Sequence, residues 1–449
     1  MRPEDKRVVC ERLFRVEEDM GVFAKSLFRE TLSQVSTDFL ETFLADCPRR
    51  DFQVRLWDGT TWGAEKQPRF TLVLKHPGAL QAMVLSPSEL TLGEAYICDD
   101  FDIEGDIEAA FDLADYLLGR ERSLGRSFAL NERLQKLPGS DRSRTGLHSA
   151  GLGGVVHSKD RDRRAISYHY DLPAEFYALW LDQRMVYSCA YFATPEEDLD
   201  TAQIRKLDYI CRKLRLRAGE RLLDIGCGWG GLIVHAAAHY GVEAVGITLS
   251  VPQAEMARKR LHELGLNDRC RVEVADYRDL EHNQQYDKIV SVGMFEHVGE
   301  RLLPEYFRRA WDLLRPGGVF LNHGIVYSAT YHRHGPSFTD RYVFPDGELV
   351  PISTSLRAAE LSSFEVRDVE SLREHYALTL HHWVRRLEAH AEQARQITDD
   401  AAYRTWRLYM AGAAHSFRSG RLNIYQTLLA KPSQGRSGLP LTREDWYRV

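Results

Sequence analysis

The sequence predicts an α/β protein in which a mostly parallel sheet carries helices on both faces, preceded by a small α+β domain. The first observation is the stretch 221–231, where an apolar strand runs directly into glycines and then into an apolar, alanine-rich helix. The second is the alternation that follows, because strand-like runs at 242–248, 270–274, 286–292 and 317–323 are separated by helical patterns. Such alternation favours parallel strands joined by helical crossovers.

The N-terminal domain, placed at residues 1–120, combines both kinds of element. Residues 1–47 carry apolar side chains at helical spacing. Runs at 52–57 and 70–74 have strand character, and an Asp-Gly turn follows the first of them. A helical pattern covers 107–118. We therefore expect a small α+β domain here.

A basic, flexible linker is predicted at residues 121–165. The stretch 120–164 holds eleven Lys or Arg and five Asp or Glu, a net charge of +6, whereas the whole chain carries −6. Glycines and serines within it are typical of a tether. A solvated tether and a patch that binds anionic lipid headgroups both fit this composition.

Composition excludes several classes of protein. A net charge of −6 provides no global basic field for nucleic acid. The seven cysteines are scattered and form no C-x-x-C pair, which favours reduced thiols in the cytoplasm, and we predict no metal site. No signal peptide and no apolar run long enough to span a bilayer is apparent, so we expect any membrane contact to be peripheral.

The glycine loop indicates a nucleotide-type ligand, and its details favour one class. The spacing is Gly226-x-Gly228-x-Gly230, whereas a dinucleotide site has G-x-G-x-x-G and an acid after the next strand. Here that strand ends in Thr248 and Ser250. The pattern is similar to the S-adenosylmethionine loop of class I methyltransferases. A nicotinamide oxidoreductase is disfavoured by the spacing, and a glycine-rich turn in another α/β domain is the plain alternative.

Seven motifs in the second domain together carry a family resemblance. They are YHYDLPAEFY (168–177), MVYSCAYF (185–192), LLDIGCGWGG (222–231), GITLS with Gln253 (246–250), FEHVG (295–299), NHGI (322–325) and HYALTL (375–380). In this order they resemble the cyclopropane fatty acid synthase family, which includes the mycolic acid cyclopropane synthases. The likeness runs from about 166 to 430. Residues 92–96 and 102–106 also resemble the lipid-associated N-terminal domain of the long bacterial members.

The resemblance implies a fold and a reaction. The fold is the Rossmann-like class I methyltransferase sheet of seven mostly parallel strands, at 166–449, with helical insertions that bind the acyl chain. The reaction is that of a cyclopropane-fatty-acyl-phospholipid synthase. A methylene is transferred from S-adenosylmethionine to a cis double bond in a phospholipid acyl chain, through a carbocation that a bound bicarbonate deprotonates. The partner is then the bilayer, with anionic lipid expected, at the inner face of the membrane.

The resemblance also assigns site residues. Glu296, His323 and Tyr376 match the side chains that order the bicarbonate, and Cys189 and Ile325 contribute through their backbones. Taken alone, Glu296 also fits a helix start, His323 a core histidine and Tyr376 a packing residue. The cofactor residues are Tyr187 and Ser188 at the methionine end, the loop residues Asp224, Gly226 and Gly228, the ribose residues Thr248, Leu249 and Gln253, and the adenine residues Asp276 and Tyr277.

One departure leaves the product open. Gly324 lies where the best-known members carry threonine, so we expect a looser pocket wall there. A related enzyme that leaves a methyl- or methylene-branched chain without a ring is therefore the first alternative. A non-catalytic lipid-binding protein with the same fold is the second. The oligomeric state stays open, a homodimer included.

Overall fold

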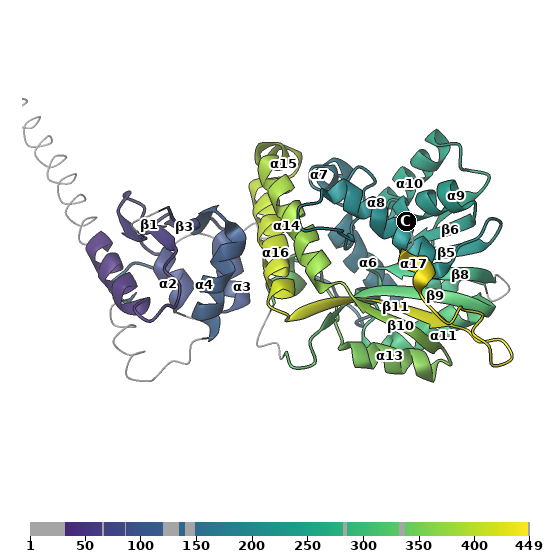
Figure 1. Cartoon of the computed structure of the whole chain (residues 1–449). Helices are drawn as coiled ribbons and strands as arrows, with labels where there is room; N and C mark the ends of the chain where they lie inside the picture. The colour runs from purple at the N-terminus through teal and green to yellow at the C-terminus, as the bar shows by residue number, and fades with distance from the viewer. Residues whose placement is uncertain are drawn as a thin grey trace, which may run out of the picture. The chain divides into compact units, whose positions relative to one another are not determined.

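The computed structural model divides the chain into two compact units, Met1–Leu147 and His148–Val449, shown in Figure 1. It describes residues 32–64, 67–85, 87–119, 134–139, 149–281, 285–331 and 337–447. Within these residues no helix is both long and apolar enough to cross a bilayer. The two units are described separately below.

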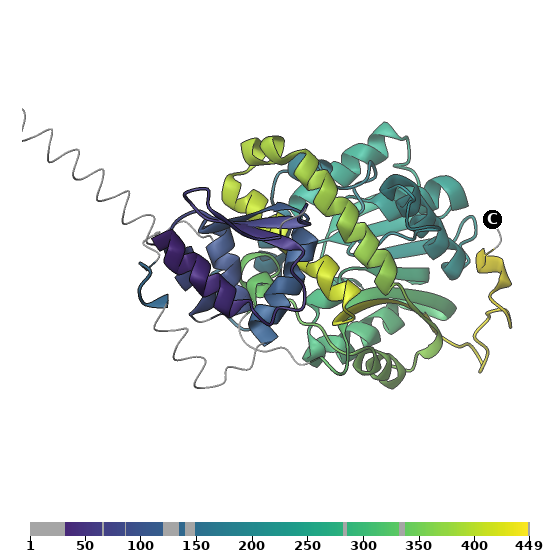
Figure 2. The same cartoon turned by 60° about the vertical axis from the view of Figure 1, so that its left-hand side comes forward.

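The N-terminal unit has the α+β character predicted for it. Its sheet has the order β2-β1-β3-β4, from Thr61–Gly63, Phe52–Arg55, Phe70–Leu74 and Phe101–Gly105 (Figure 2). The helices are residues 32–43, α2 (Ala79–Val84), α3 (Glu89–Ile97) and α4 (Ile107–Gly119). The helix predicted for residues 1–31 lies outside the described residues.

The second unit is built on a seven-stranded sheet of order β10-β11-β9-β8-β5-β6-β7. The strands are β5 (Arg221–Ile225), β6 (Glu243–Thr248), β7 (Cys270–Val274), β8 (Tyr286–Val292), β9 (Leu314–Tyr327), β10 (Glu365–Ser371) and β11 (Leu422–Ala430). Strands β5 to β9 pair in parallel, and β11 runs antiparallel to both of its neighbours. The predicted fold class is therefore confirmed.

Helices cover both faces of this sheet because successive strand residues point to opposite sides. Leu222 packs in one core with helices α8 (Leu199–Leu214), α9 (Gly231–Tyr240) and α10 (Val251–Glu263). Leu223 packs in the other core, with α11 (Leu303–Leu313) and α13 (Ile352–Leu361). Strands buried on both faces read as mostly apolar runs, and in β5 the residues Leu222, Leu223 and Ile225 are apolar and buried.

The C-terminal region contains three helices and the last two strands of the sheet. The helices are α14 (Arg373–Ala389), α15 (Ala391–Ile397) and α16 (Asp400–Arg418). Strands β10 and β11 flank these helices and complete the sheet. The shorter elements are α7 (Ala174–Ala178), α12 (Phe338–Tyr342), α17 (Glu444–Tyr447), η1 (Tyr277–Asp279), η2 (Phe295–His297) and η3 (Glu300–Leu302).

The predicted linker overlaps a helix at its C-terminal end. Residues 121–133 and 140–148 of the linker lie outside the described residues. Helix α6 spans Lys159–Tyr170, so the flexible segment predicted to end at 165 is helical from Lys159 onward. The first half of α6, residues 159–164, consists entirely of charged residues, which is why its composition resembles a tether.

Candidate active site

A pocket opens at the carboxyl ends of the central strands. Strand β5 has β6 on one side and β8 on the other. The chain runs outward from β5 through β6 to β7 and then returns to the opposite side of β5 to form β8. A crevice forms at such a switch point, and ligands of α/β proteins bind there. The pocket encloses about 1160 Å³ of empty space, including its open mouth. All ten predicted cofactor residues line it: Tyr187, Ser188, Asp224, Gly226, Gly228, Thr248, Leu249, Gln253, Asp276 and Tyr277.

The glycine loop needs its glycines for two different reasons. Gly226 has φ +89°, and a Cβ there would lie 2.9 Å from Cβ of Met294. Gly228 has φ +53°, and a Cβ there would meet nothing within 4 Å. Gly226 lets the loop lie close to Met294, which follows β8, without a steric clash. Gly228 leaves open the space that a ligand would fill.

The part of the pocket that contains the residues predicted to hold the ribose is built by a hydroxyl–amide pair rather than an acid. Thr248 Oγ1 donates to Gln253 Oε1 at 2.9 Å, and Ser250 N donates to Thr248 Oγ1 at 3.2 Å. Ser250 also caps α10, since its side chain accepts from the backbone of Gln253. This arrangement leaves Nε2 of Gln253 as a donor at the pocket wall.

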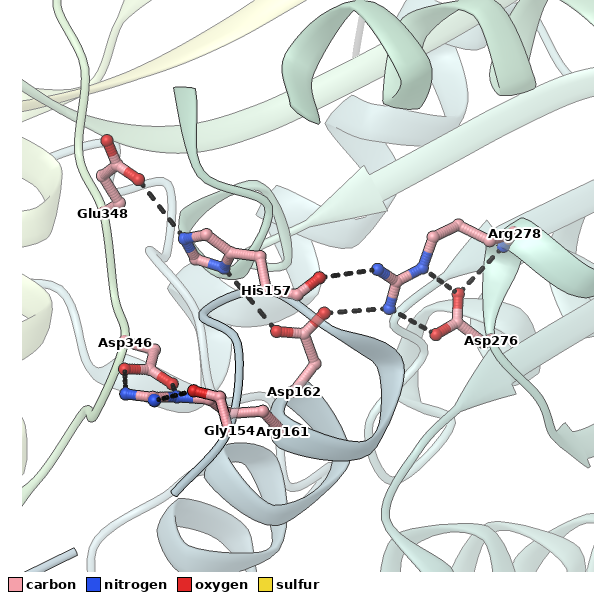
Figure 3. Close-up of polar contacts among 8 residues, drawn as sticks. All are labelled: Gly154, His157, Arg161, Asp162, Asp276, Arg278, Asp346 and Glu348. Carbon is pink, nitrogen blue, oxygen red and sulfur yellow. Dashed lines mark hydrogen bonds and ion pairs between the residues drawn. The ribbon is translucent and has the colours of Figure 1, made fainter. Parts of the chain in front are cut away.

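Asp276, which was predicted to hold the adenine, belongs to a charged network drawn in Figure 3. Asp276 Oδ1 accepts from Nε of Arg278 at 2.9 Å, and Oδ2 accepts from Nη2 at 2.6 Å. The same Nη2 donates to Asp162 of α6 at 2.9 Å, and Nη1 donates to the carbonyl of His157 at 3.3 Å. Burial acts to raise the pKa of Asp276, but the bonds from Arg278 outweigh it and lower the pKa. Asp276 is thus ionised and already paired.

The network continues from α6 to the loop that carries Glu296. Nε2 of His157 lies 3.3 Å from Oε2 of Glu348, and its Nδ1 lies 3.6 Å from Oδ1 of Asp162 (Figure 3). The backbone N–H of Glu348 donates to the carbonyl of Glu296 at 3.0 Å. The hydrogen bond to Asp162 is the main cause that raises the pKa of His157. Arg161 of α6 forms an ion pair with Asp346. Helix α6 is thus held in place by polar contacts of both Arg161 and Asp162.

Glu296 is a buried carboxyl with one oxygen unused. It lies in η2 directly after β8 and is 2% exposed. Oε1 accepts the backbone N–H of Ile325 at 2.7 Å, whereas Oε2 has no hydrogen-bond partner among the described residues. Burial raises the pKa of Glu296 to about 7, against the opposing effect of the Ile325 bond. The group can therefore change protonation state near neutral pH.

His323 and Tyr376 complete the predicted base site. His323 in β9 is fully buried, and burial lowers its pKa well below the usual value, so the ring is neutral. Its Nδ1 lies 3.5 Å from Nε2 of Gln426 in β11, and its Nε2 has no partner among the described residues. With the Gln426 amide donating, the ring proton lies on Nε2, which then needs an acceptor. Burial raises the pKa of Tyr376, with Cys189 and Glu296 among the charges that add to the shift.

Cys189 is a structural thiol. It is fully buried, its Sγ lies 3.2 Å from the carbonyl of Ala190, and burial raises its pKa strongly. The thiolate is the nucleophilic form, so this environment disfavours nucleophilic chemistry. The backbone around it is fixed by Thr379, whose Oγ1 accepts from Ala190 N at 3.0 Å.

The loosened wall expected at Gly324 is wrong. A Cβ at this position would lie 2.9 Å from Cδ1 of Phe295, so the phenyl ring already occupies the space. Phe295 is 2% exposed and packs in the apolar core beneath the sheet. The glycine is required by a close approach of an aromatic ring and leaves no gap.

Aromatic rings wall the region around Tyr187. Its ring centroid lies 5.3 Å from those of Trp180 and Trp383 and 6.2 Å from that of Trp406. Tyr376 meets Trp383 edge-on at 5.9 Å. The rings come from α14, α16 and the segment after α7, so the helical region supplies a group of packed aromatic side chains around Tyr187.

Several pocket residues were missed by sequence reasoning. Asp162, Ile166 and Tyr170 of α6 line the pocket, and their spacing of four residues places them on one face of the helix. That spacing was visible in the sequence, but it crosses the predicted boundary at 165: Asp162 fell inside the predicted linker, whereas Ile166 and Tyr170 lie just after it. Lys206 of α8 and His297 of η2 also line the pocket.

Comparison with known proteins decides the family. A family model described as mycolic acid cyclopropane synthetase matches residues 157–427. The chain belongs to this family. It is an S-adenosylmethionine-dependent methyltransferase, and the family modifies fatty acids and lipids and includes cyclopropane synthases. A second family model, a domain of unknown function, matches residues 39–116.

Named relatives place the chain among two kinds of enzyme. It is 43% identical over 401 residues to a probable fatty acid methyltransferase of Pseudomonas putida, covering 88% of this chain and 96% of that one. It is 36% identical over 276 residues to cyclopropane-fatty-acyl-phospholipid synthase of Escherichia coli strain K12, covering 62% and 70%. The solved cyclopropane synthase MmaA2 of Mycobacterium tuberculosis superposes with a TM-score of 0.57 at 34% identity, covering 60% of this chain and 97% of that one. The resemblance drawn from the motifs is confirmed.

Proposed function

We propose that this enzyme transfers the methyl carbon of S-adenosylmethionine to the cis double bond of an unsaturated phospholipid acyl chain and closes a cyclopropane ring. One observation carries the proposal. Oε2 of Glu296 and Nε2 of His323 are both buried without a partner in the described structure; Glu296 follows β8, and His323 lies in β9 opposite the last residue of β8. Such a pair suits a small anion that has both an O–H and free oxygens.

The reaction requires a dry site with a proton acceptor. S-adenosylmethionine supplies an electrophilic methyl group, which even a weakly nucleophilic alkene attacks. A positive charge then develops on the acyl chain, and loss of a proton from the new methyl group closes the ring. The aromatic rings around Tyr187 and Trp383 exclude water and present π faces to that charge.

The base site fits bicarbonate, which would supply the proton acceptor there. Glu296 would accept the O–H of the ion through Oε2 while Ile325 holds Oε1. His323 would donate from Nε2, and the hydroxyl of Tyr376 is the third group. Bound at this position, the ion would be oriented by the three side chains, whereas Cys189 contributes packing and backbone.

A branched product is the second candidate. Relatives named as probable fatty acid methyltransferases, from Pseudomonas putida and Mycobacterium tuberculosis, favour it. Both outcomes share the attack on the sulfonium methyl group. For a methylene branch, a hydride first shifts to the cationic carbon and a proton then leaves the new methyl group, so a double bond forms in place of the ring, and a saturated methyl branch requires a later reduction of that bond by a separate hydride donor. The filled wall at Gly324 and Phe295 removes the gap that we had taken as an argument for the branched product.

Lipid chemistry tests the proposal directly. Phospholipids from cells that express the chain, and from cells that express Glu296→Gln, are converted to fatty acid methyl esters and separated by gas chromatography with mass detection. A product heavier by one CH₂ that elutes as a cyclopropane supports the proposal. A saturated methyl branch or a methylene group would select the second candidate. Unchanged chains would refute both.

We also propose that the enzyme works in the cytoplasm, bound peripherally to the inner face of the membrane. Its substrate class is a bilayer lipid, and the basic stretch 120–164 carries a net charge of +6. Sedimentation with phosphatidylglycerol and with phosphatidylcholine vesicles, at low and high salt, tests this. Binding that prefers the anionic vesicles and weakens with salt is expected, and indifference to both would exclude the basic stretch as the anchor.

A further inference from the structure

The segment between α7 and α8 reaches the cofactor pocket through a backbone conformation that is unusual for its sequence. The segment carries Tyr187 and Ser188, which line the pocket. Met185, two residues before Tyr187, has φ +56° and is 6% exposed. Among the described residues that have a side chain and a positive φ, it is the one hydrophobic residue. The left-handed conformation is unfavourable for a residue with a Cβ, and methionine has no polar group that could offset the cost by a local hydrogen bond.

The buried carboxylate of Asp182 binds the backbone on both sides of Met185. Asp182 is 1% exposed. Its Oδ2 accepts from the N–H of Arg184 at 2.9 Å, and its Oδ1 accepts from the N–H of Val186 at 2.8 Å. The carbonyl of Asp182 accepts from the N–H of Met185 at 2.8 Å. Three consecutive N–H groups therefore bind one residue, which fixes the turn at Met185.

Side chains from three helices hold the outer side of the same turn. Asp200 of α8 accepts from the N–H of Gln183 at 2.8 Å. Arg260 of α10 donates to the carbonyls of Gln183 and Arg184, both at 2.8 Å. Arg386 of α14 donates to Oδ2 of Asp200 at 2.6 Å. An unfavourable backbone conformation persists where its surroundings over-determine it in this way, and such residues cluster at functional sites.

The turn packs directly against the glycine loop. A Cβ at Gly231, the first residue of α9, would lie 2.9 Å from Cγ2 of Val186 and 3.2 Å from the carbonyl oxygen of Arg184. A change in the conformation of Met185 would redirect the chain after it. Tyr187 and Ser188 would then move relative to the glycine loop.

We propose that Asp182 is a positioning residue for S-adenosylmethionine. Its carboxylate holds Met185 in the left-handed conformation, and this turn sets the direction in which the chain presents Tyr187 and Ser188 to the pocket. Asp182 is not among the residues that line the pocket, so it acts through the turn. The inference concerns the cofactor of the family and does not depend on the acyl product.

Asp182 also has an electrostatic effect that the test must separate from this role. Burial lowers the pKa of Lys206 to about 8, and among the neighbouring charges that oppose this shift Asp182 acts most strongly. Lys206 lines the pocket, so the loss of the negative charge would change the pocket as well. Replacing Met185 with glycine separates the two effects, because glycine adopts a positive φ without a penalty.

The test is a double-mutant cycle on the full chain, with the affinity for S-adenosylhomocysteine measured by calorimetric titration. Asp182→Asn keeps the size of the side chain but places an amide N–H against a backbone N–H of the turn. Met185 is then no longer held in the left-handed conformation. We expect the affinity to fall by ~5- to 30-fold, the factor that corresponds to the cost of that conformation. In the Met185→Gly background the same substitution should lower the affinity by no more than ~2-fold.

Arg215→Gly is the matched control. Arg215 ends α8 with φ +52° and does not line the pocket, so glycine removes an unfavourable conformation there as well. In this background Asp182→Asn should keep its full effect on the affinity. Circular dichroism establishes that each variant is folded under the conditions of the titration.

Two results of the titration would overturn the proposal. An unchanged affinity in Asp182→Asn would mean that the turn does not need the carboxylate. An equal loss in the wild-type and Met185→Gly backgrounds would assign the effect to the charge near Lys206. If Asp182→Asn does not fold, the Met185→Gly background should restore folding, and a double variant that stays unfolded would overturn the proposal as well.

Discussion

Replacing Glu296 with glutamine is expected to lower turnover by roughly 10- to 150-fold and to leave cofactor affinity unchanged. Glutamine keeps the shape and its Oε1 can still accept from Ile325, now bonded at 2.7 Å. Its Nε2 then replaces the unpartnered Oε2 and presents N–H groups where an acceptor is needed. A hydrogen bond to a charged group is worth about 1.5–3 kcal/mol. Because ~1.4 kcal/mol is tenfold in rate, the stated range follows.

The assay measures turnover on unsaturated phosphatidylglycerol vesicles in degassed, carbonate-free buffer, with and without added bicarbonate. Bicarbonate should stimulate the wild type and have little effect on Glu296→Gln. Titration with S-adenosylhomocysteine serves as the control for folding and cofactor binding. Wild-type turnover that is equally fast in both buffers would falsify the bicarbonate role and make Glu296 itself the first candidate for the proton acceptor. A variant with normal turnover would remove Glu296 from the chemistry.

The same residue predicts a pH profile. Burial raises the pKa of Glu296 from 4.5 to about 7. A raised carboxyl pKa means that the fold favours the protonated form. Its contribution to stability is complete below about pH 4.5 and is lost as the pH rises through about 7. The ionised form is the acceptor, so turnover should rise with pH through about 7, and Glu296→Gln should lack this inflection.

Three further predictions address the pocket and its supports. Gly228→Ala and the control Gly265→Ala both place a side chain at positive φ, so each should lower the free energy of unfolding in urea by about 1–2 kcal/mol. Only Gly228→Ala should also lower the affinity for S-adenosylhomocysteine, measured by calorimetry. Gly324→Thr should lower the free energy of unfolding in urea by ~1–3 kcal/mol, because its side chain would clash with Phe295. An unchanged free energy of unfolding would mean that the pocket wall has free space there after all. His157, whose pKa is raised first by a carboxylate hydrogen bond, adds stability that is complete below about pH 6.5 and declines above it. His157→Gln should flatten that decline, and parallel unfolding profiles for the two proteins would contradict this.

Most of the residues predicted to bind the cofactor lie at or shortly after the end of a strand, whereas Tyr187 and Ser188 lie between α7 and α8. Asp224 and Gly228 come at the end of β5, Thr248 at the end of β6 and Asp276 just after β7. Once the strands are parallel, their carboxyl ends lie at one edge, and local motifs are brought together by topology alone. Short-range patterns therefore suffice for this half of the site.

The rest depends on contacts between distant segments. Arg278 was not predicted as a link to Asp162, because that pairing is set by how α6 packs and leaves no local pattern. Strand β11 was missed because its partners lie far away in the sequence. Lys206 did leave a signal: a lysine on the buried stripe of α8, between Gln203 and Ile210, is out of place unless it binds something.

Asp224 near the end of β5 and Glu296 just after β8 are expected to serve two different ligands. Among the described residues, the buried carboxylate oxygens without a hydrogen-bond partner are Oδ1 of Asp224 and Oε2 of Glu296. Burial raises both pKa values to about 7. The carboxylates of Asp182 and Asp276 differ from them in having partners, since Asp182 accepts from the backbone N–H of Val186 and Asp276 accepts from Arg278. Neighbouring strands thus end in two acceptors that the chain itself does not satisfy. Asp224 lines the cofactor pocket, so Asp224→Asn should change the affinity for the cofactor. Glu296 belongs to the proposed base site, so Glu296→Gln should change turnover. If both variants changed the same quantity, the two acceptors would belong to one ligand and the assignment to two ligands would be refuted.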